Sequence, residues 1–397
     1  MTLLVRPRIS VVMPVHNGEE FLCQTLDCIL SQTFRDFELI IVDDGSSDGT
    51  SALLDSCGDR RIVRLRNEAN RGVAYSRNRG NAMARGQYIA VHDSDDLSTL
   101  DRFEKQVTFL DSHLEIGIVG SQGMLLSNGQ SSPMRVPIHN DEIQALLLGQ
   151  NCLLHSSLMI RADLIRKVGG YNEQYIAAPD YDLVLRISEL TQVANLADFL
   201  YFKRARPGSI TYSPKGLWQK RCVLQAIEEA LERRCSRGQV VALHRNFALA
   251  CLAAACAESA FGEVDRITAY VQKALEVDML LHRRKEAAQM LADYAEGYAL
   301  KAGALGGNPN EIINRVFARW PKSKKPLCLV RRTRALVMAG VAFSAYRRQQ
   351  WRETAVWASK SLVIWPAGLG NRGLVSIAGR SFLRLLLPTT NKRSKPV

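Results

Sequence analysis

Closely spaced aspartates are the residues of this sequence most suited to chemistry. Asp43 and Asp44 are adjacent, and Asp93, Asp95 and Asp96 fall within four positions. Carboxylates grouped in this way repel one another unless a positive charge lies between them. A hard divalent cation, Mg²⁺ or Mn²⁺, neutralises them through oxygen ligands and also bridges a diphosphate. The second group therefore predicts a cation site, with an exposed acidic turn as the alternative.

The first acidic pair suits a different ligand. Glycine and serine residues follow it and allow a tight turn whose backbone can approach a bound molecule closely. A carboxylate at such a turn can accept hydrogen bonds from the N–H of a nucleotide base or from ribose hydroxyls. We therefore expect Asp43 and Asp44 to bind a ligand, whereas Asp48 is expected to cap the next helix.

A third acidic group, Asp180-Tyr181-Asp182, opens an expected helix that runs to about residue 190. Asp180 is then either the cap of this helix or a base. As a base, its carboxylate would remove a proton from an attacking hydroxyl group. The residues alone leave both interpretations open.

Short apolar runs alternate with helical patterns in the first half of the chain and must position these acids. The expected strands are residues 9–14, 37–42, 61–65, 87–92 and 116–120, and the expected helices between them are 20–31, 48–56, 73–84 and 101–112. This alternation predicts βαβ units and a mainly parallel sheet. Ligands of such sheets bind at the carboxyl ends of the strands, which is where the first two acidic groups stand.

The alternation stops after residue 212, and the remaining sequence is helical and rich in Ala, Leu and Arg. We therefore expect an α/β domain over residues 1–212, a helical domain over 213–314 and a basic helical tail over 315–397. The helical domain has a weak tetratricopeptide-like spacing, carried by Gly262, Ile267, Ala274 and Leu275. Ordinary amphipathic helices packing together are the favoured explanation of that spacing.

The net charge of +13 is concentrated at one end of the chain. Residues 1–215 carry 22 basic and 26 acidic residues, residues 216–314 carry 12 of each, and residues 315–397 carry 18 basic residues and one acid. An acidic first half makes nucleic acid an unexpected substrate. The basic tail predicts an anionic partner, such as a membrane surface, with a solvated basic face as the alternative.

The cysteines and the hydropathy of the chain favour the cytoplasm. Nine cysteines are scattered without a C-x-x-C pair, which is typical of a reducing compartment. The first ten residues do not form a signal peptide, and no apolar stretch approaches the roughly 20 residues that a membrane span requires. We expect a cytoplasmic protein, peripheral on the inner face of the cell membrane if the tail binds lipid.

Several motifs together resemble the family 2 glycosyltransferases. Their order and spacing match the family over roughly residues 8–212, in the segments ISVVMPVHNGEE (9–20), SQTFRDFE (31–38), IVDDGSSD (41–48), NRGVA (70–74), RN (77–78), DSDD (93–96), HSSLM (155–159), GGY (169–171) and DYDL (180–183). The resemblance implies a GT-A fold and transfer of a sugar, with inversion, from a nucleotide-sugar donor.

The resemblance also implies roles for individual residues. Asp44 would meet the base, expected to be uracil, Asp93 would reach the ribose, and Asp95 would hold a metal on the diphosphate. Asp180 matches the family's catalytic base. The expected nucleotide-sugar site comprises Pro14, His16, Asn17, Asp43, Asp44, Arg77, Asp93 and Arg206.

Two positions depart from the family's pattern. Arg206 stands where members often carry a histidine, and Pro179 stands where many carry an acid. A guanidinium cannot ligate a metal, but it pairs with phosphate, so Arg206 either stabilises the leaving group or is a structural arginine.

The expected function is a metal-dependent, hexosyltransferase-type enzyme that acts on a glycan or lipid-linked acceptor in cell-surface polysaccharide synthesis. The alternative is a non-catalytic scaffold that binds a nucleotide-sugar while its helical half recruits partners. The two departures favour the scaffold, and the retained aspartates favour the enzyme.

Overall fold

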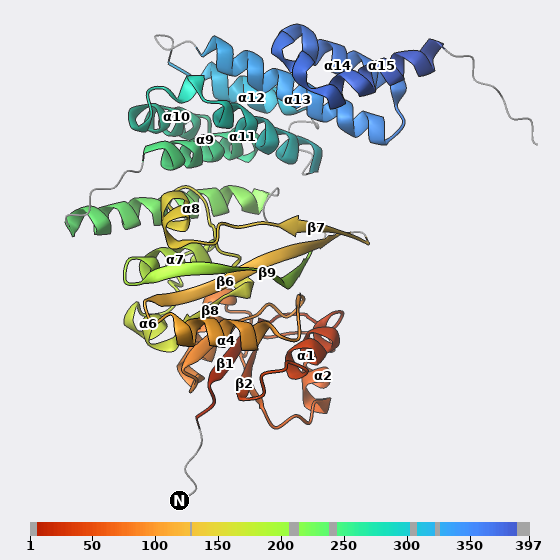
Figure 1. Ribbon diagram of the computed structural model, residues 1–397. Helices are drawn as coiled ribbons and strands as arrows, with labels where there is room; N and C mark the ends of the chain where they lie inside the picture. The colour runs from red at the N-terminus through yellow and green to blue at the C-terminus, as the bar shows by residue number, and fades with distance from the viewer. Residues whose placement is uncertain are drawn as a thin grey trace, which may run out of the picture. The chain divides into compact units, whose positions relative to one another are not determined.

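The structure is a computed structural model, and it describes residues 6–127, 129–205, 214–237, 244–301, 308–321 and 326–386 (Figure 1). The chain divides into two compact units. One comprises residues 1–209 and 222–243, and the other comprises residues 210–221 and 244–397. The domain boundaries expected at residues 212 and 314 stay a prediction.

One sheet forms the centre of the first unit, with the strand order β3-β2-β1-β4-β8-β6-β9-β5 and β7 paired to β6. Parallel pairing joins β3, β2, β1 and β4, and also β6 with β9, whereas β5, β7 and β8 add antiparallel pairs. The strands are β1 (Ile9–Val15), β2 (Phe37–Asp43), β3 (Ile62–Arg66), β4 (Tyr88–Val91), β5 (Leu97–Ser98), β6 (Ile116–Ser127), β7 (Gln130–Met134), β8 (Met159–Arg161) and β9 (Gln192–Arg204).

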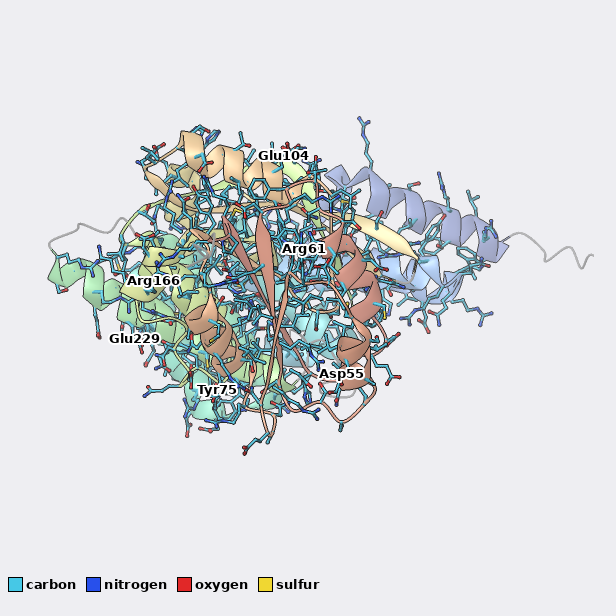
Figure 2. All side chains as sticks on the ribbon, turned by 90° about the horizontal axis from the view of Figure 1, so that it is seen from below. Asp55, Arg61, Tyr75, Glu104, Arg166 and Glu229 are labelled. Atoms are coloured by element: carbon cyan, nitrogen blue, oxygen red, sulfur yellow. The ribbon has the colours of Figure 1, made fainter. Side chains whose placement is uncertain are left out.

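Helices connect and cover the strands, and the apolar sides of both build the core. β1 and β2 are buried along nearly their whole length, which explains their mostly apolar sequence. Charged side chains on the outer faces of the helices are exposed, among them Asp55, Glu104 and Arg166 (Figure 2). The helices are α1 (Leu22–Leu30), α2 (Thr50–Ser56), α3 (Val73–Met83), α4 (Arg102–Ser112), α5 (Asn140–Leu147), α6 (Ala162–Lys167) and α7 (Pro179–Ser188).

The strand register decides where the acidic groups lie. Val15 at the end of β1 pairs with Asp43 at the end of β2, and Val12 pairs with Val91 at the end of β4. The three strands therefore finish at one edge of the sheet. The loops that carry the first two acidic groups meet there, as expected from βαβ units.

The rest of the described chain is helical. Its elements are α8 (Pro214–Ser236), α9 (His244–Phe261), α10 (Val264–Val277), α11 (Lys285–Glu296), α12 (Pro309–Ala318), α13 (Leu327–Arg347), α14 (Trp351–Ile364) and α15 (Arg372–Leu386). The expected fold class, a mostly parallel α/β sheet followed by a helical region, is confirmed.

Candidate active site

A hollow of about 240 Å³ opens at the edge where β1, β2 and β4 end. Five of the sequence-predicted site residues line it, namely Pro14, His16, Asp44, Asp93 and Asp95, together with Val15, Asn70, Gly72, Val73 and Ser94. Asn17, Asp43, Arg77 and Asp180 are not among the lining residues. Arg206 lies outside the described residues.

Asp44 organises one wall of the hollow. Its Oδ1 accepts hydrogen bonds from Asn67 Nδ2 at 2.7 Å and from the backbone N–H of Arg71 at 2.8 Å. Its Oδ2 accepts from the backbone N–H of Gly72 at 2.9 Å. Gly72 has a φ of 91°, a conformation that favours glycine. The carboxylate therefore holds the loop before α3 in place and leaves one lone pair on Oδ2 for a ligand.

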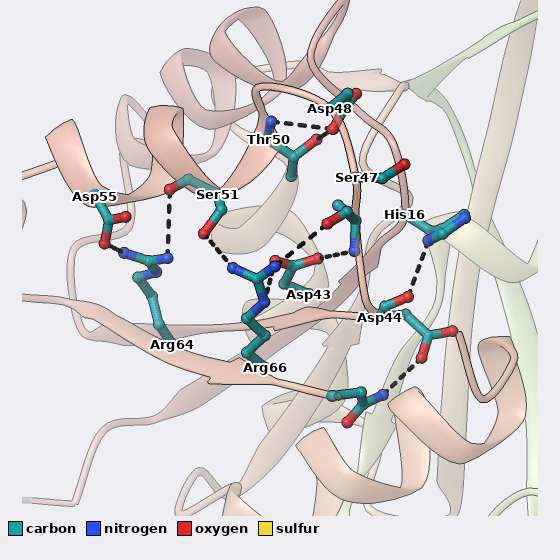
Figure 3. A network of polar contacts seen from close by, with 12 residues as sticks. His16, Asp43, Asp44, Ser47, Asp48, Thr50, Ser51, Asp55, Arg64 and Arg66 are labelled. Atoms are coloured by element: carbon teal, nitrogen blue, oxygen red, sulfur yellow. Dashed lines mark hydrogen bonds and ion pairs between the residues drawn. The ribbon is translucent and has the colours of Figure 1, made fainter. Parts of the chain in front are cut away.

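Asp43 closes the turn beneath this wall. Its Oδ1 accepts from the backbone N–H of Ser46 at 2.9 Å, and its Oδ2 lies 3.7 Å from Arg66 Nε (Figure 3). The side chain of Asp43 is 1% exposed. These contacts give Asp43 a positioning role in the turn.

His16 and Asn17 hold the end of β1 against the same turn. His16 Nδ1 lies 2.9 Å from the backbone oxygen of Asp44 (Figure 3). Asn17 has a φ of 50°, its N–H donates to Ser46 Oγ, and its Oδ1 accepts from the N–H of Ser47. His16 thus lines the hollow, whereas Asn17 fastens the loop behind it.

Asp93 sits in a dense polar network at the end of β4. Arg77 Nη2 donates to its Oδ1 at 2.5 Å, and Ser156 Oγ donates to its Oδ2 at 2.6 Å. Its backbone N–H donates to the hydroxyl of Tyr201 at 3.2 Å. Burial opposes ionisation, but Arg77, then Lys203 and the Ser156 hydrogen bond hold the pKa of Asp93 well below its ordinary value.

Asp95 and Asp96 follow in the same loop with different surroundings. Asp95 lines the hollow, and its backbone oxygen accepts from Arg204 Nη1 at 2.8 Å. Asp96 is buried, and its Oδ1 accepts from the backbone N–H of Arg204 at 2.9 Å. Burial, Asp93 and Asp95 together raise the pKa of Asp96 to about 7. The repulsion expected within this group is therefore present.

The acidic loop fits a cation that also binds a substrate. Within the described ranges, no group of three or more His, Cys, Asp or Glu side chains could hold a metal ion. Mg²⁺ is commonly held by one or two carboxylates together with substrate phosphates. Asp95 in the hollow, with Asp93 beside it, matches that pattern once a diphosphate supplies the remaining oxygens.

Asp180 stands in the first turn of α7 and is partly exposed. The preceding Ala178 has a left-handed φ of 59°, and Pro179 fixes the first helical position. The charge of Asp180 favours the protonated forms of Arg77 and His155, so it acts on the network around Asp93.

Three buried side chains of this network were not predicted from the sequence as site residues. His155 Nε2 lies 3.0 Å from the hydroxyl of Tyr171, and the guanidinium of Arg77 lies 5.8 Å from the ring of Tyr171. Burial and then Arg77 lower the pKa of His155 to about 4, so its imidazole is neutral near pH 7. The third, Tyr201, bonds Asp93 as described above. His155 and Tyr171 lie in the HSS and GGY segments that match the family, and these matches could have indicated them as site residues.

Lys203 is a further residue of the site that was not predicted from the sequence. It lies two residues after Tyr201 on β9, on the same face of the strand because side chains alternate. Its charge lowers the pKa of both Asp93 and Asp96, and within the described chain it forms no ion pair. A lysine in this position is a point charge available to a phosphate.

The sequence itself matches known proteins over the part that forms this site. The family model for glycosyl transferase family 2 matches residues 10–167. EpsE of Bacillus subtilis (strain 168), a protein named as a glycosyltransferase, is 34% identical over 221 residues, which cover 52% of this chain and 78% of EpsE. The chain belongs to glycosyl transferase family 2.

The chain is also similar, at lower identity, to two further proteins. The chondroitin synthase of Escherichia coli is 28% identical over 240 residues, which cover 58% of this chain and 34% of that synthase. The crystal structure of the mannosyltransferase PcManGT from Pyrobaculum calidifontis, in complex with GDP-Man and Mn²⁺, has a TM-score of 0.48 and 17% identity. It covers 80% of this chain and 88% of PcManGT.

Proposed function

We propose that this glycosyltransferase is an inverting, metal-dependent, hexosyltransferase-type enzyme. It moves a sugar from a nucleotide-diphosphate donor, a UDP-sugar, to a glycan or lipid-linked acceptor in cell-surface polysaccharide synthesis. The observation that carries the proposal is the hollow in which Asp44, Asp93 and Asp95 come together at the carboxyl ends of β1, β2 and β4. Pro14 and His16 complete the side on which the nucleotide would lie.

Asp44 suits recognition of the base because its position is fixed before a ligand arrives. Its contacts to Asn67 and to the backbone of the loop before α3 hold the carboxylate at the wall of the hollow. Asp93 is fixed in the same way by Arg77 and Ser156 and would accept a ribose hydroxyl. A rigid site avoids part of the ordering entropy that binding costs.

Asp95 would hold Mg²⁺ or Mn²⁺ on the donor diphosphate, with Asp93 close by. When bound, the cation would neutralise charge on the departing nucleoside diphosphate. Lys203 faces the same acids and would contribute a further positive charge to the leaving group. Arg206 is proposed to assist in that role.

Asp180 is proposed as the catalytic base. A partly exposed carboxylate at the start of α7 can accept the proton of an acceptor hydroxyl as that hydroxyl attacks the anomeric carbon. Attack from the side opposite the leaving group inverts the anomeric configuration. The transition state resembles an oxocarbenium ion, as in glycoside hydrolysis.

Binding of donors to the purified protein tests the proposal. Calorimetric titration with UDP-, GDP- and dTDP-sugars, with and without Mn²⁺, should give metal-dependent binding of one nucleotide class. Asp95→Ala should abolish that binding, whereas Asp180→Asn should leave it nearly intact and abolish turnover. Absence of binding to every donor would contradict the proposal. Donor binding without turnover in the wild type would favour the non-catalytic scaffold.

The basic C-terminal region is proposed to hold the enzyme on the inner face of the cell membrane. None of the helices in the described part of the chain is long and apolar enough to span a bilayer. However, α15 exposes Val375, Phe382 and Leu383 and carries Arg380 and Arg384. An apolar strip beside basic residues is typical of an interfacial helix, and each basic residue contributes about 1 kcal/mol near anionic lipid.

Sedimentation with liposomes tests this association. The full chain should bind vesicles that contain phosphatidylglycerol and should dissociate from them as the salt concentration rises. Phe382→Ser with Leu383→Ser should weaken binding without changing the charge. Equal binding of neutral and anionic vesicles, or no binding to either at low salt, would contradict the association.

A further inference from the structure

The second half of α8 follows the sheet in the sequence but belongs to the unit that contains the active site. Its basic side chains reach α7, the helix that carries Asp180 in its first turn. We propose that residues 222–237, the second half of α8 and the residue after it, position the base by fixing α7 at its carboxyl end. This inference rests on the proposed role of Asp180.

Glu189, directly after α7, receives two of the contacts. Arg233 Nε donates to its Oε1 at 3.0 Å, and Arg237 Nη1 lies 3.2 Å from its Oε2. The side chain of Glu189 is 1% exposed, so its charge is compensated within the protein. Removal of the partners of a buried charge is strongly destabilising for the element that carries it.

Arg234 adds a buried contact at the same end. It is 8% exposed, and its Nη2 donates to Gln144 Oε1 at 3.2 Å and to Ser188 Oγ at 3.3 Å. Gln144 of α5 in turn donates to the backbone oxygen of Ser188 at 3.0 Å. The last residue of α7 is therefore fixed from two helices at once.

α8 also acts on the chain that enters α7. Tyr175, four residues before the helix, is buried, and burial together with the nearby Glu229 carboxylate of α8 raises its pKa. Within α7, Arg186 pairs with Asp182 and donates to the backbone oxygens of Val168 and Gly170. α8 thus approaches α7 near both of its ends.

A helix transmits such constraints because it is stiff. Asp180 and Glu189 are nine residues apart, which is about 14 Å along an α-helix. A shift at the carboxyl end therefore displaces the first turn, where a misplacement of about 1 Å lowers a reaction rate roughly 100-fold. The donor-binding residues lie on other elements, so we expect a displacement of α7 to affect the base more than donor binding.

The test uses Arg233→Ala/Arg237→Ala in the full chain. We expect kcat per donor-binding site to fall about tenfold or more, with the Kd for the donor unchanged within about twofold. Arg233→Lys/Arg237→Lys should recover most of kcat because the charge returns. The matched control is Glu232→Gln, an exposed residue of the same helix, which should behave as the wild type.

Three outcomes distinguish this inference from the proposed function. An unchanged kcat per donor-binding site in Arg233→Ala/Arg237→Ala overturns the inference. The inference is also overturned if total activity falls only in proportion to the number of donor-binding sites that remain. In either case, loss of turnover in Asp180→Asn preserves the proposed function. Full activity of Asp180→Asn instead contradicts the base itself.

Discussion

Arg77 is a basic residue that interacts with both Asp93 and the proposed base Asp180. It is 4% exposed, its Nη2 pairs with Asp93, and its Nη1 is buried with no hydrogen-bond partner within the described residues. Asp180 also favours its charged form. The guanidinium of Arg77 interacts with both Asp93 and Asp180, and its positive charge keeps Asp93 ionised. Arg77 is therefore better described as a positioning residue than as part of the lining of the hollow.

Two buried histidines make stability depend on pH. Burial, the largest cause for each, lowers the pKa of His92 to about 3 and that of His155 to about 4, against an ordinary value of 6.5. Below pH 6.5 the unfolded chain therefore binds protons that the folded chain does not. The two histidines should lower the free energy of unfolding between pH 7 and 5, by up to about 1.4 kcal/mol per pH unit each. Asp96, whose pKa is raised to about 7, acts in the opposite direction over the same range and offsets about one of them.

Urea unfolding at several pH values measures this slope. His155→Gln removes one titrating group and should make the slope shallower. His139→Gln, which changes an exposed histidine directly before α5, is the control and should leave the slope unchanged. A slope unaffected by His155→Gln would contradict the assignment.

Removal of the charge of Lys203 should lower the affinity for the donor. Lys203→Met should weaken nucleoside-diphosphate binding by about tenfold or more, because a hydrogen bond to a charged group contributes about 1.5–3 kcal/mol. Lys105, which pairs with Asp101 and Asp198, offers the control, and Lys105→Met should bind as the wild type. Calorimetry with UDP and Mn²⁺ compares the two, and equal affinities would exclude a contact between Lys203 and the ligand.

At the scale of elements, the hollow depends on loops that pack closely on each other. Gly45 has a φ of 69°, and a Cβ placed there would lie 2.5 Å from the backbone carbon of Ala69. Gly45→Ala should therefore push apart the loops after β2 and β3 and lower both stability and donor affinity. Gly58 has open space around it, so Gly58→Ala is the matched control. Thermal unfolding and donor titration of both variants test the expectation.

The strands and the acidic loops could be predicted because local sequence encodes them. β1 and β2 have mostly apolar sequences because both faces are buried, and Asp44 and Asp93 lie within two residues of strands that end at one edge. Tyr201 and Lys203 could not be predicted in the same way. They come from a strand more than 100 residues later, and the pairing of β9 with β5, which directly follows the acidic loop, brings them to Asp93.

At the scale of the whole chain, the sequence predicted where the alternation of strands and helices stops. It could not predict that α8 is divided between the two compact units, because its pattern is helical throughout. The ion pairs between the second half of α8 and the first unit join Glu189 to arginines 44 and 48 positions away. Spacing along the chain carries no information about such pairs.

The division within α8 has a consequence for recombining members of the family. In a chimera joined directly after the last strand of the sheet, Glu189 would come from one parent, and the residues at positions 233 and 237 would come from the other. The incoming α7 would then meet a foreign α8 whose basic residues need not match its own acids. Chimeras of this enzyme should therefore be joined after residue 243, where the first unit ends, so that both helices come from one parent.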